Sequence, residues 1–202
     1  MNRQQPSLAA YIADPNTALE IPLVSEKFCR AVVDMARPTA RLYCIRRSAV
    51  RRALNALSSI DRWGKVRFTT AVKSTVEAYM RDDGGIYMSY GAFARSNGAS
   101  FVAMFCHELA HVWLLRQEGY AELKLLDKTF RTTFADLPNV VDVSPIEYLA
   151  VCTCANILRA AADVIGNTNK KYCDMLRSLA DKEASKAATL RNIIVSLRTA
   201  AE

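Results

Sequence analysis

The sequence has 202 residues, of which 51% are hydrophobic and 23% are charged, and this balance excludes an intrinsically disordered or linker-dominated chain. Lys and Arg outnumber Asp and Glu by 27 to 20, which gives a formal net charge of +7. A positive balance of this size is compatible with an acidic partner such as nucleic acid but does not require one.

The first predicted elements are two helices and two short strands. A helix is predicted over residues 25–35, and Pro38 ends it. Residues 41–46 suit a strand, and residues 48–59 suit a helix because their apolar side chains recur at helical spacing. Residues 65–70 are rich in β-branched and aromatic side chains, which predicts a further strand.

Arginines are concentrated in the N-terminal part, residues 1–60, which we expect to be mainly helical and basic. Pairs of arginines recur there at helical spacing beside apolar residues, which is typical of a solvated helix face and also of a nucleic-acid-binding surface. We favour the solvated face and keep nucleic-acid binding as an alternative. The cluster comprises Arg37, Arg41, Arg46, Arg47, Arg51 and Arg52.

A β-hairpin is predicted next in the chain. Residues 72–80 alternate between apolar and polar side chains, which favours a strand with one wet face, although the same residues tolerate a helix. The sequence Arg-Asp-Asp-Gly-Gly at 81–85 is a turn signal, and residues 86–90 form another apolar segment. We therefore predict a hairpin centred on Asp83 and Gly84.

Only helices are predicted in the second half of the chain. Their boundaries are 100–117, 120–134, 144–164 and 170–197. Gly119 separates the first two. A small sheet followed by a helical majority indicates the α+β class. The length fits a single domain, 1–202, with a central part at 65–164 and a C-terminal helix at 170–198.

The cysteines and the apolar segments indicate where in the cell the protein is expected. The six cysteines form no Cys-x-x-Cys pair, so we expect reduced thiols in a cytoplasmic protein. The longest apolar stretch, 101–115, is too short to span a bilayer and contains three ionisable residues, so no membrane association is expected. The N-terminal residues lack the long apolar core of a secretory signal.

The only two histidines, His107 and His111, flank Glu108 in the motif His-Glu-x-x-His. Residues four apart on a helix project from one face, so the two imidazoles can share one metal ion. Glu108 is placed to reach a water on that ion without binding it. Because apolar residues surround the motif, burying these groups without partners would cost several kcal/mol. The alternative is two core histidines bonded to the backbone, with Glu108 in a salt bridge.

The motif at 107–111 resembles the active-site helix of the zincin metallopeptidases. The predicted strand at 86–90 resembles the edge strand along which those enzymes bind an extended substrate. The resemblance covers residues 65–161 and implies a catalytic core at 65–164, zinc as the cofactor and a peptide or protein as the substrate. Small gluzincins, of the minigluzincin-like or ImmA/IrrE-like type, share this compact layout with a distant Glu as the third ligand.

Zinc needs a third protein ligand, and no further histidine exists. Glu118 lies on the same helix face as the histidines but about 10 Å further along the axis. Glu147, at the start of a predicted helix, resembles the third ligand of the gluzincins, and we favour this role, although Ser144 and Glu147 also fit a capping box. Gluzincins often carry Asp four residues later, where this chain has Val151. The other candidates are Glu122, Asp136 and Asp142.

The resemblance also implies a mechanism. Zinc acidifies a water molecule, and Glu108 acts as the general base that accepts its proton and passes it to the leaving amine. The developing oxyanion needs a donor, for which we expect Tyr148 first, and Tyr87 or Tyr90 otherwise. Two further functions stay open, a non-catalytic zinc-binding regulatory protein and a basic nucleic-acid-binding protein.

Overall fold

The computed structural model describes residues 8, 10–13, 22–38, 42–71 and 76–201. Its fold is α+β, as predicted, with a three-stranded mixed sheet in the N-terminal half and a helical C-terminal half. The elements are α1 (Ala10–Ala13), α2 (Glu26–Ala36), α3 (Leu42–Leu57), β1 (Arg67–Ala71), β2 (Ala78–Met80), β3 (Gly85–Ser89), α4 (Tyr90–Arg95), α5 (Gly98–Leu115), α6 (Tyr120–Thr133), η1 (Val140–Val143), α7 (Pro145–Ile165), η2 (Gly166–Asn169) and α8 (Lys170–Ala201).

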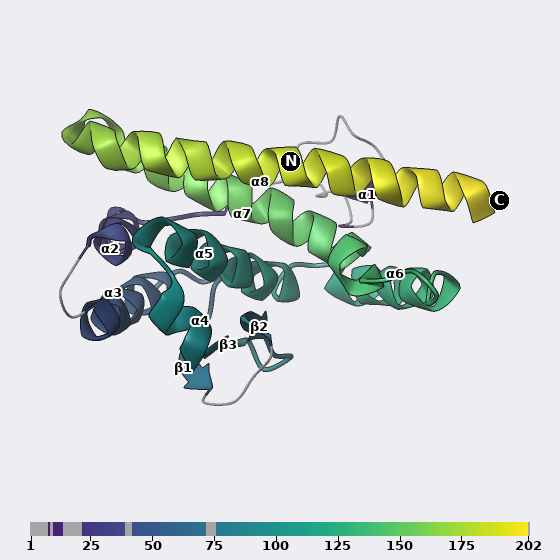
Figure 1. Ribbon diagram of the computed structural model, residues 1–202, viewed down its shortest axis with the longest axis horizontal. Helices are drawn as coiled ribbons and strands as arrows, with labels where there is room; N and C mark the ends of the chain where they lie inside the picture. The colour runs from purple at the N-terminus through teal and green to yellow at the C-terminus, as the bar shows by residue number, and fades with distance from the viewer. Residues whose placement is uncertain (1–7, 9, 14–21, 39–41, 72–75, 202) are drawn as a thin grey trace.

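The helical layer is built around α5 and α7. Helix α5 lies between α7 and the sheet, and α8 runs along the other side of α7 (Figure 1). The predicted helices of the second half are present, and the unpredicted short helix α4 precedes α5. Gly119 has a φ of 80°, the left-handed conformation in which glycine is favoured, and it separates α5 from α6.

The sheet has the strand order β1-β3-β2. Strands β2 and β3 form the predicted antiparallel hairpin, in which Ala78 pairs with Met88 and Met80 pairs with Ile86. The turn is closed by the N–H of Gly84, which donates to the carbonyl of Arg81 at 2.8 Å. Of the strand predicted over 72–80, residues 78–80 form β2, and 72–75 lie outside the described residues.

The prediction that residues 86–90 form an edge strand is wrong. Strand β3 pairs with β2 on one side and, in parallel, with β1 on the other, so its backbone groups are already used. A parallel pairing of β1 with β3 requires a crossover between strands that are not consecutive in the chain, which no local pattern predicts. The edge strand beside α5 is β2.

The prediction of a strand at 41–46 is also wrong, because helix α3 begins at Leu42 and continues without a break. The buried side chains of α3 follow a helical period that starts at Arg46 and continues through Ala49, Val50 and Ala53. Packing of this face on α2 therefore favours the helix over the local strand preference.

The arginine cluster does not form one solvated face. Arg46 is buried, with its guanidinium over the ring of Phe101 at 5.2 Å from the centroid. Arg37 and Arg52 both form ion pairs with Asp34. Arg46 therefore lies inside the fold, while Arg37 and Arg52 are exposed, and nucleic-acid binding stays a prediction.

Two helices, α5 and α7, have the length and hydropathy that a membrane span requires, and more than half of each is buried inside the protein. Core helices of soluble proteins pass the same test, so the finding is weak evidence for a membrane. The buried face of α5 includes Phe101, Phe105 and Leu109, and that of α7 includes Leu149 and Leu158. This shared core fixes the two helices that carry the site described next.

Candidate metal centre

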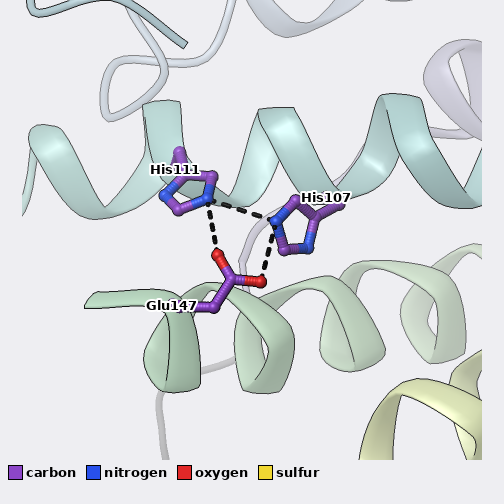
Figure 2. A group of neighbouring side chains, drawn as sticks. All are labelled: His107, His111 and Glu147. Carbon is purple, nitrogen blue, oxygen red and sulfur yellow. Dashed lines mark hydrogen bonds and ion pairs between the residues drawn. The ribbon is translucent and has the colours of Figure 1, made fainter. Parts of the chain in front are cut away.

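Helix α5 places the two imidazoles on one face, one turn apart. The Nε2 atoms of His107 and His111 are 3.2 Å from each other (Figure 2). Asn97 is the N-cap of α5, and its side-chain oxygen accepts the N–H of Ser100; the helix then continues past both histidines to Leu115. A rigid, buried helix therefore sets the spacing of the pair.

Helix α7 supplies a carboxylate to the same point. Glu147 Oε1 is 3.4 Å from His107 Nε2, and Oε2 is 3.4 Å from His111 Nε2 (Figure 2). Ser144 is the N-cap of α7, and its hydroxyl accepts the N–H of Glu147 at 3.5 Å. The serine half of the predicted capping box is thus present, while the glutamate side chain lies with the histidines.

An aspartate on α6 holds the first turn of α7 in place. Asp127 is buried, and its Oδ1 accepts the N–H of Ile146 at 2.9 Å. Its other oxygen forms an ion pair with Arg131 at 2.6 Å. Glu147 follows Ile146 directly, so Asp127 helps to fix the backbone that carries the carboxylate. The sequence gives no signal for this contact, because Asp127 lies on an otherwise amphipathic helix.

The donor set fits a divalent metal ion. One ligand atom from each of His107, His111 and Glu147 lies within 4.8 Å of the others. Two imidazole nitrogens and one carboxylate oxygen are the ligands that zinc takes in catalytic sites with an open fourth position. Both Nε2 atoms face each other and the carboxylate, which differs from the alternative of core histidines bonded to the backbone. The identity of the metal is not fixed by this geometry.

The charge of Glu147 is consistent with ligation. Burial favours the neutral acid, but hydrogen bonds from His107 and His111 and the charges of both rings outweigh it and hold the pKa of the Glu147 carboxyl well below its usual range. The side chain is 16% exposed. A carboxylate that stays ionised in such a setting needs positive partners, of which Lys186 Nζ at 3.0 Å is one and a metal ion would be another.

Glu108 lies beside the three candidate ligands without joining them. It is 6% exposed and lines the same cleft as the histidines. Burial raises the pKa of Glu108 to about 7; His111 opposes this shift and the charge of Glu147 adds to it. A carboxyl group with this pKa can both accept and release a proton near neutrality.

The site lies in a cleft of about 920 Å³. Strand β2 forms one wall through Ala78, Tyr79 and Met80, and α6 forms the facing wall. The α6 wall carries tyrosine, lysine and arginine side chains as well as Asp127. The cleft is open to solvent and runs past β2, the edge strand of the sheet in the part of the chain that the structure describes, so an extended chain has both space and a strand to pair with beside the candidate metal centre.

The predicted oxyanion tyrosines lie elsewhere. Tyr148 is 8% exposed, is absent from the cleft lining, and has a pKa raised to about 12 by burial and by its contact with Cys152. Tyr87 stacks on Tyr79 at 5.4 Å between centroids, and Tyr90 is exposed. A catalytic role for Tyr148 stays a prediction.

Two tyrosines that the sequence did not single out, Tyr79 and Tyr120, line the cleft. Burial raises the pKa of Tyr120, so its hydroxyl stays protonated and can donate. In the sequence, Tyr79 is marked only by the alternation of apolar and polar residues over 72–80, and Tyr120 only by its place after Gly119. The position of each tyrosine depends on how β2 packs on α5 and how α6 packs on α7, and this is decided by tertiary contacts.

The other carboxylates considered as third ligand do not join the cluster. Asp142 lines the cleft but lies outside the group of three ligand atoms. Glu118, Glu122 and Asp136 are exposed. Among the residues that the structure describes, Glu147 is therefore the carboxylate that meets both histidines.

We expect Glu147→Gln to weaken zinc binding by at least about 100-fold, because it removes an anionic ligand. Residues that only orient a metal ligand already contribute about 10–100-fold to metal affinity. Asp142→Asn is the matched control, since Asp142 lines the same cleft without contacting the histidines. Competition with a chromophoric chelator measures both affinities. Equal zinc affinity in the Glu147 variant and the wild type would remove Glu147 from the ligand set.

Comparisons of the chain with protein-family models, with curated proteins and with solved structures found no match. The assignment of this site therefore depends on the motif and on the geometry described above.

Proposed function

We propose that the chain is a zinc-dependent metallopeptidase of the gluzincin type. The observation that carries the proposal is the meeting of the His-Glu-x-x-His pair with Glu147 from a second helix, inside an open cleft that also contains Glu108. The donor set of His107, His111 and Glu147 suits zinc and leaves room for a fourth ligand. A purely structural zinc site is instead closed by four protein ligands.

The residues of the cleft have distinct roles in this proposal. When bound, zinc supplies a Lewis acid that polarises a carbonyl group and acidifies water. Glu108 accepts the proton of the attacking water and delivers it to the leaving amine, for which its buried position and raised pKa are suited. Tyr79 and Tyr120 supply hydroxyl donors in the cleft for the developing oxyanion.

Strand β2 positions the substrate in the proposed reaction. Among the described strands it is the outer neighbour of β3, so an extended peptide laid along the cleft can pair with its outer edge. Backbone pairing fixes the direction of the peptide. The residues that line the walls of the cleft would select which peptide side chains fit. The substrate class is therefore an unfolded segment of a peptide or protein.

The direct test is digestion of a mixed peptide library by the zinc-loaded protein. We expect new internal cleavage products by mass spectrometry, their loss when a zinc chelator is added, and their return when zinc is restored. Products that persist at full yield in excess chelator would show that a contaminating, metal-independent peptidase is responsible. Zinc content below about half an equivalent after loading would contradict the proposed metal site.

A further inference from the structure

Helix α8 brings a lysine to the candidate metal centre. Lys186 Nζ lies 3.0 Å from Glu147 Oε1. The contact is set by the packing of α8 along α7, in which the neighbouring Ala187 and Leu190 are buried. Lys186 is 47% exposed, so its stem lies at the surface while its ammonium reaches a carboxylate that is only 16% exposed.

The two oxygens of Glu147 have different partners. Oε1 faces both the ammonium of Lys186 and His107 Nε2, while Oε2 faces His111 Nε2. A carboxylate oxygen that accepts a charge-assisted hydrogen bond has less of its lone-pair density to offer a metal ion. Oε2 is therefore the better donor of the two.

We propose that Lys186 is a positioning residue that holds the Glu147 carboxylate so that Oε2 binds the metal as a single donor. The inference rests on the metal site of the proposed function and does not require peptidase activity. Partners that orient a metal ligand contribute to metal affinity through that ligand. An ordinary surface ion pair would have no such effect, because its two charges are solvated whether or not they meet.

The test compares zinc affinity and the visible spectrum of the cobalt-substituted protein. Lys186→Met keeps the length of the side chain and removes its charge, and we expect zinc affinity to fall by about 10-fold or more. The Co²⁺ absorption should become weaker in the same variant, because a released carboxylate that binds through both oxygens raises the coordination number. Lys186→Arg, which can donate to the same oxygen, should keep zinc affinity within about threefold of the wild type.

Lys182→Met is the matched control, since Lys182 lies one turn earlier on α8 and is exposed, and the ion pairs of Glu147 among the described residues are with His107, His111 and Lys186. It should leave both the zinc affinity and the cobalt spectrum unchanged. Thermal unfolding of the metal-free proteins checks that each variant is folded, and the half-exposed position of Lys186 makes loss of the fold unexpected.

The outcomes separate this inference from the proposed function. If the wild type binds zinc and Lys186→Met has the same affinity and spectrum, the positioning role is overturned while the metal site stands. If Lys186→Arg behaves like Lys186→Met, the role is overturned as well. If the wild type binds no zinc, the metal site itself is wrong, and the role of Lys186 falls with it.

Discussion

Glu108→Gln is expected to keep a full equivalent of zinc and to lower peptide hydrolysis by about 10²–10⁴-fold, the usual contribution of a general base. Glutamine has nearly the same shape as glutamate but cannot take up a proton. Glu108 is not among the three candidate ligands, so its replacement should not disturb metal binding. Metal analysis and the rate of cleavage of one peptide, measured on the same preparation, provide the two readouts.

Glu118→Gln is the control for the charge change, because Glu118 is exposed and follows the end of the same helix α5. Its cleavage rate should equal that of the wild type. A Glu108→Gln protein that cleaves as fast as the wild type would rule out Glu108 as the base. Loss of zinc from that variant would instead place Glu108 among the groups that hold the metal.

His107→Ala is expected to abolish specific zinc binding, because it removes one of the two imidazoles that face Glu147. A ligand that binds only the native state stabilises it by about 2.7 kcal/mol when its free concentration is 100 times Kd. For a domain of this size, that corresponds to a rise in Tm of roughly 5–11 °C. The wild type should show this rise on addition of zinc, and the variant should show none.

The metal-free wild type is the reference for His107→Ala. It keeps the histidine ring but has no zinc, so it separates the effect of losing the ring from the effect of losing the metal. We expect the metal-free variant to unfold at a somewhat lower temperature than the metal-free wild type, because the His107 side chain is 18% exposed and its ring faces the Glu147 carboxylate. Differential scanning calorimetry with and without zinc measures the effect. An equal zinc-dependent rise in Tm for variant and wild type would show that zinc binds elsewhere.

The parts of the site that follow from local spacing could be predicted from the sequence. The four-residue separation of His107 and His111 fixes one face of one helix, whatever the rest of the fold does. The position of Glu147 in the first turn of a helix followed from Ser144 and the proline after it. That this helix meets α5 at the histidines was an expectation from the gluzincin resemblance, and the structure brings the three side chains together.

The parts that depend on distant segments could not be predicted. The resemblance of residues 86–90 to a substrate-binding edge strand is misleading, because β3 also pairs with β1 through a crossover that leaves no local pattern. Tyr148 was favoured for its place next to Glu147, although neighbours on a helix point in different directions. Lys186 gave no signal at all, since its contact with Glu147 depends on how α8 packs along α7.

The location of the candidate ligands on α5 and α7 has a mechanical consequence for the segment between them. All of α6 and η1 lies in the chain between His111 and Glu147, so an ion held by both ends would tie this segment into a ring. The spacing between its ends, which the shared apolar core of α5 and α7 already restricts, would then also be set by bond lengths to the ion. In the proposed peptidase, loading the ion would thereby fix the width of the opening through which a substrate reaches the cleft.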